Sequence, residues 1–379
     1  MLPESMRRYL SRYFSLGYLD SLEAALKTPA SRYFLRVNSL KANPADVVSV
    51  MREEGYEVYQ HSIVREAIYT LVKGPNTVAV HRGRVIVDWK TAESAYVGAN
   101  IYAPGVQKVM NCEKGDFVTV FSPAGVPVAE GVLEMTPKEI FSERKGLAVR
   151  STNSIYRVPS FREHPFYRAG VLYAQSFPSM AAVKALPLRE DWTVLDMCAS
   201  PGGKATHAAE IMKDKGEVIA VDRSEKKVRE IEENARRLGL RSIKPLVYDS
   251  RYISDVVDSN SIDVVILDPP CTTLGIRPKL IYTRGEKDVY QSAEYQRQFL
   301  SEAYKVLRRS GILLYTTCTL TPHENELNII YAVSEIGFKA LPLSLPFSLR
   351  SPLLGVDGGV FDPVVSDTPG FFISMLVKR

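Results

Sequence analysis

The chain has 379 residues, of which 45% are hydrophobic and 24% charged, and its formal net charge is +5. This composition suits a globular protein of two or three domains and leaves ample apolar material for a large core. No apolar stretch reaches membrane-spanning length, so we expect no membrane contact. The small positive charge permits a nucleic-acid partner without requiring one.

Four cysteines stand far apart, at positions 112, 198, 271 and 318, and none belongs to a CxxC pair. The five histidines, including His207 and His323, fit no zinc-ligand spacing, so we expect no metal site. Isolated thiols are poorly suited to an oxidising compartment, which predicts a cytoplasmic protein. Residues 1–14 are amphipathic and lack the pattern of a secretory signal.

Residues 1–72 are predicted to form a small α+β leader domain. Apolar residues at helical spacing predict helices within 7–16 and 21–27. The alternation in RYFLRVNSL (32–40) indicates a strand, and NPADVVSVMREEG (43–55) has the start and stop signals of a helix.

Residues 73–158 are predicted to form a compact β-barrel of short strands. TVAVHRGRVIVDW (77–89) alternates around Arg82 and Gly83, which is typical of a hairpin. Further short alternating runs separated by turn residues follow, and we expect no helix in this region. Such a pattern favours a small closed barrel.

Residues 159–379 alternate strand and helix, which predicts an α/β fold with a parallel, doubly wound sheet. The predicted strands are 192–198, 217–222, 244–249, 263–268, 311–319 and 371–378; the predicted helices are 204–212, 226–238, 292–307 and 324–336. In sheets of this kind the ligand lies at the carboxyl ends of the strands.

LDMCASPGGKATHAAE (195–210) joins a strand to a helix through a glycine-rich turn. Glycines allow a ligand close to the backbone, and a helix N-terminus offers free N–H groups to an anion. Because the segment lacks GxGxxG and a P-loop ending, a dinucleotide, a phosphate or a purely structural turn all remain open at this point.

Four aspartates, Asp196, Asp222, Asp249 and Asp268, end or nearly end successive strands. Asp222 stands where a ribose-binding carboxylate is expected, and Asp249 where an acceptor would meet an adenine amine. One acid alone would be no more than a solvated strand end. Their common register favours a nucleoside with a charged tail, such as S-adenosylmethionine.

Cys271 and Cys318 follow the fourth and fifth predicted strands and so should face one pocket. Two buried, inert thiols are the alternative. Carbon 5 of cytosine is too weak a nucleophile to take a methyl group, but a thiolate added to carbon 6 activates it. Lys204 can lower the pKa of such a thiol, and Asp268 can hydrogen-bond the cytosine. The base must be unstacked first.

The catalytic half resembles the Nol/Sun (Fmu-type) family of RNA cytosine-5 methyltransferases, through segments that occur in the family's order. These are YRAGVLYAQSFPSM (167–180), CASPGGK (198–204), VDRSEKKV (221–228), DPPCTTLG (268–275) and TTCTLTPHENE (316–326), with TPASRYFLRVNSLKANPADV (28–47) in the leader. Ser200 stands where alanine is common, and Pro270 makes the usual D-A-P-C into D-P-P-C. The resemblance implies a Rossmann-like doubly wound methyltransferase sheet in residues 159–379.

By this resemblance Cys318 is the nucleophile, Cys271 assists product release, and Asp268 and Lys204 complete the catalytic set. The cofactor is S-adenosylmethionine. Its implied binding residues are Cys198, Ala199, Ser200, Pro201, Gly202, Gly203, Lys204, Asp222, Lys227, Asp249 and Asp268.

The inserted barrel resembles a PUA domain through ANIYAPGVQ (99–107) and KGDFVTVFSPAGVPVAEGVLE (114–134). PUA domains bind structured RNA, often a tRNA 3′ end; a structural or protein-binding barrel is the alternative. The domain order implies 5-methylcytosine formation at the acceptor-stem cytosine at tRNA position 72, beside the CCA end. Single-stranded ends are where proteins most readily read RNA.

Two alternatives to this function stay open: the same chemistry at another tRNA position or in rRNA, and a non-catalytic RNA-binding assembly factor that kept the fold. We expect a monomer, because one tRNA end needs one pocket. A group of basic residues either holds phosphates or forms a solvated face; it comprises Arg7, Arg8, Arg12, Arg32, Arg36 and Lys41.

Overall fold

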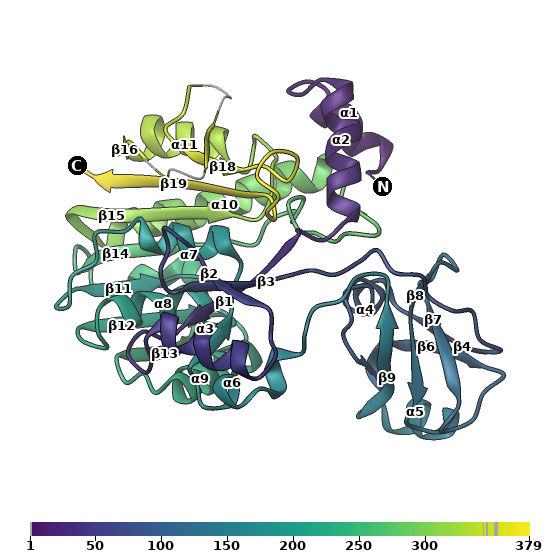
Figure 1. The fold of residues 1–379 in the computed structure, drawn as a ribbon. Helices are drawn as coiled ribbons and strands as arrows, with labels where there is room; N and C mark the ends of the chain where they lie inside the picture. Colours follow the sequence, from purple (N-terminus) through teal and green to yellow (C-terminus); the bar gives the residue numbers. More distant parts are fainter. Residues whose placement is uncertain (1, 344, 346–347, 352–354) are drawn as a thin grey trace.

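The computed structural model describes residues 2–343, 345, 348–351 and 355–379. Figure 1 shows the leader segment packed on a large α/β domain, with a separate β-rich domain to one side. In the described part of the chain, no helix is both long and apolar enough to cross a membrane.

The leader domain forms a four-stranded antiparallel sheet in the order β10-β1-β3-β2. The leader contributes α1 (Glu4–Leu10), α2 (Leu16–Lys27), β1 (Arg32–Val37), α3 (Pro44–Glu53), β2 (Val58–Gln60) and β3 (Ala67–Leu71), and the outer strand β10 (Leu172–Ala174) comes from the α/β part of the chain. The Asn43 side chain caps α3 by accepting from the Ala45 N–H, as the sequence predicted. Because β10 comes after the barrel, residues on both sides of the insertion build this sheet.

The β-rich domain is a six-stranded sheet in the order β5-β9-β8-β7-β4-β6 around its own apolar core. Its elements are β4 (Gly83–Val87), α4 (Trp89–Ala95), β5 (Ile101–Tyr102), β6 (Val106–Met110), β7 (Phe117–Phe121), β8 (Pro127–Leu133), α5 (Pro137–Glu143) and β9 (Leu147–Ser154). Backbone hydrogen bonds between Lys73 and Arg157 join the two segments that lead into and out of it.

Two predictions for this domain are wrong. The two short helices α4 and α5 were not expected; each starts at a side-chain cap, Asp88 for α4 and a Thr136–Glu139 capping box for α5. The hairpin at Arg82 and Gly83 is also absent, because β4 pairs with the distant strands β6 and β7. A Cβ on Gly83 would lie under 3 Å from side chains of Cys112 and Val118, so close packing rather than a turn requires glycine there.

The catalytic domain is a Rossmann-like doubly wound sheet, as predicted, in the order β13-β12-β11-β14-β15-β19-β18-β17, with β16 also paired to β19. Its strands are β11 (Thr193–Asp196), β12 (Glu217–Asp222), β13 (Ile243–Val247), β14 (Ile262–Leu267), β15 (Leu307–Thr317), β16 (Phe338–Leu341), β17 (Leu349–Arg350), β18 (Gly359–Phe361) and β19 (Phe371–Lys378). The first five strands of this order are parallel.

Helices cover both faces of this sheet, with one apolar core on each side. They are α7 (Phe177–Lys184), α8 (Gly203–Ile211), α9 (Glu225–Leu238), α10 (Glu286–Val306) and α11 (Glu326–Tyr331). The short helix α6 (Pro165–Arg168) packs beside β10 of the leader sheet instead. The leader sheet shares the core that holds α7 and α8, whereas α1 and α2 pack near the start of α10. Because β15 runs antiparallel to β19, the carboxyl ends of the parallel strands in Figure 1 lie at the side of the sheet nearer the β-rich domain.

Arg36 is fully buried at the contact between the leader and the catalytic domain. Its Nε donates to Glu210 Oε2 at 2.9 Å and its Nη2 to Thr206 Oγ1 at 2.8 Å. Both alternatives, phosphate binding and a solvated face, are thus wrong for Arg36, which joins two domains instead. Other basic side chains of that group also have internal partners: Arg7 pairs with Asp20 and Glu23, Arg12 with Glu286, and Lys41 donates to the carbonyls of Ala169 and Arg237.

Candidate active site

A cavity of about 210 Å³ opens at the carboxyl ends of β11 and β14. It is lined by Tyr173, Ala174, Gln175, Ser176, Ser179, Asp196, Cys198, Ala199, Ser200, Pro201, Gly203, Lys204 and Asp268. Seven of the residues predicted to bind the cofactor are among them. Of the remaining predicted residues, Gly202, Asp222, Lys227 and Asp249 lie outside this lining.

The glycine-rich turn has the geometry expected of an anion-binding loop. Gly202 has a φ of +105° and immediately precedes α8, which begins at Gly203. A side chain would be strained at that φ, which accounts for glycine there. The first N–H groups of α8 have no partner within the helix, so the turn presents donors toward the cavity.

Asp196 ends β11 and faces the cavity from below the turn. Burial raises the pKa of Asp196 to about 7, although the nearby positive charge of Lys204 opposes the rise. A positively charged ligand in the cavity would favour the ionised carboxylate. Sequence reasoning noted Asp196 at a strand end but gave it no role.

Asp222 and Asp249 occupy the ends of the neighbouring strands, as predicted, but each already has an internal partner. Asp222 Oδ2 accepts from Lys227 Nζ at 3.4 Å and its Oδ1 from the Ser224 N–H at 3.1 Å. Asp249 forms a close ion pair with Arg251, which holds the pKa of Asp249 below its usual value. A ligand amine at Asp249 would compete with that guanidinium.

The two thiols meet at the same edge of the sheet. Cys271 follows β14 and Cys318 follows β15, and these strands are adjacent and parallel. The two Sγ atoms are 3.3 Å apart, within hydrogen-bonding distance. The two thiols therefore lie together, but neither is in the lining of the 210 Å³ cavity, so the prediction that both face one pocket stays a prediction.

Charges around the thiols differ on the two sides. Burial would lower the pKa of Lys204, but Asp268, Asp196 and Cys318 together raise it, so Lys204 remains a cation. Lys204 also forms an ion pair with Asp268. On the other side, the hydrogen bond to Cys318 and then burial raise the pKa of Cys271 well above its usual value. Cys271 therefore remains a thiol, and Cys318 is the thiol whose charge acts on Lys204.

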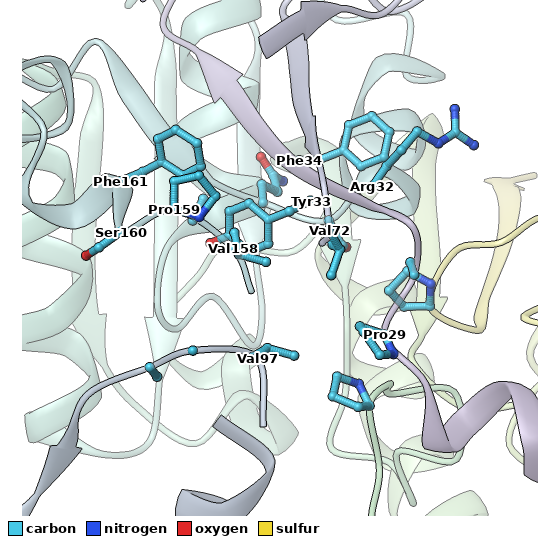
Figure 2. A pocket seen from close by; sticks show the side chains of 18 of the residues that line it. Pro29, Arg32, Tyr33, Phe34, Val72, Val97, Val158, Pro159, Ser160 and Phe161 are labelled. Carbon is cyan, nitrogen blue, oxygen red and sulfur yellow. The ribbon is translucent and has the colours of Figure 1, made fainter. Parts of the chain in front are cut away.

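A second, larger cavity of about 480 Å³ adjoins the first and shares Ala174, Gln175 and Ser176 with it. Figure 2 shows it between β1 and the segments on either side of the β-rich domain, with Tyr33, Phe34 and Phe161 among its ring-bearing residues. Sequence reasoning did not find this cavity, because its walls come from all three domains.

A sequence model of the family described as 16S rRNA methyltransferase RsmB/F matches residues 183–376, just over half of the chain. The chain belongs to this family. A model of the PUA domain matches residues 83–155, which correspond to the β-rich domain. Both resemblances predicted from the sequence are confirmed, and membership in the RsmB/F family makes the protein an S-adenosylmethionine-dependent methyltransferase.

Several known proteins are similar to this RsmB/F family member over most of its length. The tRNA (cytosine(72)-C(5))-methyltransferase of Pyrococcus horikoshii is 36% identical, with 99% of this chain and 97% of the relative covered. Human tRNA (cytosine(72)-C(5))-methyltransferase NSUN6 is 31% identical, with 89% and 78% covered. The crystal structure of NSun6 from Pyrococcus horikoshii with SFG superposes with a TM-score of 0.90, covering 99% of this chain and 98% of that one.

Among the residues that the structure describes, no group of three or more His, Cys, Asp or Glu side chains is arranged to hold a metal ion.

Proposed function

We propose that this protein uses S-adenosylmethionine to form 5-methylcytosine in tRNA, at the acceptor-stem cytosine at tRNA position 72. The observation that carries the proposal is the pair of thiols, Cys271 and Cys318, 3.3 Å apart beside a nucleoside-sized cavity. The proposed tRNA substrate follows from the relatives, because their sequence similarity to this chain extends through the leader and the PUA domain.

S-adenosylmethionine fits the 210 Å³ cavity by the chemistry of its walls. The N–H groups at the start of α8 suit its carboxylate, and the carboxylate of Asp196 suits its positive charge. Asp222 would accept from the ribose once Lys227 moves aside. The homologous crystal structure was determined with SFG, an analogue of this cofactor. Bound there, the cofactor supplies the methyl group.

Cys318 acts first in the proposed reaction. Its thiolate forms a bond to carbon 6 of the flipped cytosine, and the electron pair of the ring's double bond makes carbon 5 nucleophilic. Lys204 stabilises the thiolate before the attack. Asp268, held by Lys204, orients the ring through a hydrogen bond to its nitrogen or amine.

Cys271 acts in product release. Its hydrogen bond to Cys318 is the largest cause of its raised pKa, and that bond is lost once Cys318 is bonded to carbon 6. Cys271 then gives its proton to solvent and, as a thiolate, takes the proton from carbon 5. The bond between carbon 6 and Cys318 breaks, Cys318 leaves as a thiolate, and the double bond is restored.

The tRNA acceptor end would lie across the catalytic and PUA domains. The 480 Å³ cavity between them combines aromatic rings with Arg32 and Arg162, a composition suited to unpaired nucleotides and their phosphates. The single-stranded CCA end would extend to the PUA domain while the neighbouring base pair opens at the thiols. The same proposal includes three further points. The domain limits are 1–72, 73–158 and 159–379, each monomer binds one tRNA, and the protein is cytoplasmic.

Synthetic RNA hairpins test the choice of substrate. The full-length protein should methylate an acceptor-stem hairpin that ends in CCA at least about 10-fold faster than one without CCA, because lost contacts of 1.4 kcal/mol already give that factor. An anticodon-arm hairpin of the same length should not react. Equal rates on all three hairpins, or methylation of an rRNA fragment alone, would contradict the proposed substrate.

Deleting residues 73–158 tests the PUA domain itself, since the paired backbone of Lys73 and Arg157 allows a short linker across the gap. Binding of S-adenosylmethionine in calorimetry serves as the control for folding. Full activity of the deletion variant on the acceptor hairpin would show that the PUA domain does not select the substrate. A full-length protein that binds no S-adenosylmethionine would favour the non-catalytic alternative.

A further inference from the structure

Each active-site thiol is followed by a threonine, and the two threonines are hydrogen-bonded to each other. Thr272 follows Cys271, Thr319 follows Cys318, and their Oγ1 atoms are 2.9 Å apart. Both side chains are buried. The loops that carry the thiols are therefore joined one residue beyond the reacting sulfur atoms.

Glu324, six residues after Cys318, accepts hydrogen bonds from this junction. Its carboxylate receives the Thr272 N–H at 2.9 Å, the Thr272 hydroxyl, and the Thr321 hydroxyl at 2.6 Å. It also receives the Gln296 side-chain N–H at 2.9 Å, and the residue is 0% exposed. Four donors thus converge on one buried carboxylate in the loop of the nucleophile.

Gln296 on α10 extends the network to the residue before Cys271. Its Nε2 donates to the Pro270 carbonyl at 3.0 Å as well as to Glu324. Its Oε1 accepts from the Tyr315 hydroxyl at 3.0 Å, and Tyr315 lies on β15, just ahead of Cys318. The backbone on both sides of Cys271 is consequently fixed relative to the strand that carries Cys318.

A carboxylate accepts all four of these hydrogen bonds as they stand. A glutamine at position 324 would turn its NH₂ group either toward the N–H groups of Thr272 and Gln296, which cannot accept, or toward the two threonine hydroxyls, which would have to reorient from donors to acceptors. Burial raises the pKa of Glu324, while the hydrogen bonds from Thr272, Thr321 and Gln296 oppose the rise by stabilising the ion. A buried donor left without its acceptor costs about 1–3 kcal/mol, so such a change would shift the Thr272 loop.

We propose that Glu324 is a positioning residue, which acts through Thr272 to hold Cys271 at the distance from Cys318 that product release needs. The carboxylate of Glu324 is hydrogen-bonded to Thr272, Thr321 and Gln296 rather than to either thiol, and the inference rests on the proposed function. Cys318 can attack carbon 6 without Cys271, but removal of the carbon-5 proton requires Cys271 in place. Loss of the hydrogen bonds between Glu324 and Thr272 should therefore slow product release more than the attack of Cys318 on carbon 6.

The test uses full-length protein, S-adenosylmethionine and the acceptor-stem hairpin in single-turnover reactions. Thr272→Val and Glu324→Gln should raise the ratio of covalent protein–RNA adduct to released 5-methylcytosine by about 10- to 100-fold, because a misplacement of about 1 Å costs rates of that order. Thr272→Ser keeps the hydroxyl and should restore a ratio near that of the wild type. Thr321→Val removes one donor only and should shift the ratio in the same direction by less.

Glu326→Gln is the matched control, since Glu326 is another buried acid on the same segment whose hydrogen bond goes to Ser351 and not to either thiol loop. It should leave the ratio unchanged. The inference is overturned if Thr272→Val keeps the wild-type ratio. It is also overturned if adduct and product fall together with S-adenosylmethionine binding, which would indicate a purely structural role. A wild-type protein that makes no 5-methylcytosine would instead remove the proposed function.

Discussion

Cys271 Sγ lies 3.3 Å from Cys318 Sγ, although 47 residues separate them in the chain. The contact follows from topology, because β14 and β15 are adjacent parallel strands that end at the same edge. The environment of the pair is asymmetric: Lys204 lies on the side of Cys318, whereas burial and the hydrogen bond keep Cys271 protonated. The proposed function gives the attacking role to Cys318 on the basis of this asymmetry.

Replacing each cysteine in turn should separate the two roles. Cys318→Ala should form neither adduct nor product, because no thiolate then attacks carbon 6. Cys271→Ala should form an adduct that persists, since the base for the carbon-5 proton is missing. Denaturing gels with labelled tRNA detect the adduct as a slower band. A persistent band with Cys318→Ala and none with Cys271→Ala would reverse the assignment.

Lys204→Gln should slow adduct formation by on the order of 100-fold, the usual cost of removing one charge-stabilising donor from an active site. The measurement is best made in the Cys271→Ala background, where adduct accumulates and release does not interfere. Lys227→Gln is a suitable comparison, because Lys227 contacts Asp222 rather than the thiols. It should alter the affinity for S-adenosylmethionine more than the rate of adduct formation. Equal rates of adduct formation with Lys204→Gln and with wild type would contradict the role given to Lys204.

Arg36→Met should destabilise the protein by about 3–5 kcal/mol, because it leaves Glu210 buried without its cation. Denaturant unfolding measures the loss. Arg162→Met, at an exposed position beside the larger cavity, should leave stability within about 0.5 kcal/mol of wild type and weaken tRNA binding. If Arg36→Met instead weakened tRNA binding with unchanged stability, Arg36 would contact RNA after all.

Glu326 should make the protein less stable as the pH rises. Burial raises the pKa of Glu326 to about 7, above the value of 4.5 expected in the unfolded chain. Below pH 4.5 Glu326 is protonated in both the folded and the unfolded protein. Between pH 4.5 and 7 Glu326 ionises in the unfolded protein only, so the free energy of unfolding falls as the pH rises. Above pH 7 it ionises in both states, and the free energy of unfolding levels off. Glu326→Gln should remove a fall on the order of 3 kcal/mol. Parallel pH profiles for variant and wild type would contradict this.

Much of the catalytic domain was predictable because its signals are local. Apolar segments that alternate with helical segments predict a parallel sheet, and the aspartates indicate where its strands end. The turn at Gly202 and the two cysteines at strand ends belong to short segments whose chemistry can be interpreted without the rest of the chain.

The remaining features depend on contacts between distant segments. Gly83 resembled a hairpin turn because its close approach to Val118 is not visible in the local pattern. Arg36 resembled a surface cation because Glu210, its partner, is 174 residues away. The helix α5 could have been found from the capping box at Thr136 and Glu139, a local signal that was overlooked. Glu324 stood within a motif that was noticed, but two of its three donor residues, Thr272 and Gln296, come from other segments.

Bisulfite sequencing of total tRNA incubated with the protein and S-adenosylmethionine tests the central claim most directly. The account predicts a new 5-methylcytosine at position 72 of the acceptor stem, which disappears with Cys318→Ala. Methylation confined to other tRNA positions would keep the chemistry and contradict the substrate. If tRNA remained unmethylated while the protein bound S-adenosylmethionine, the claim that this is a tRNA methyltransferase would be wrong.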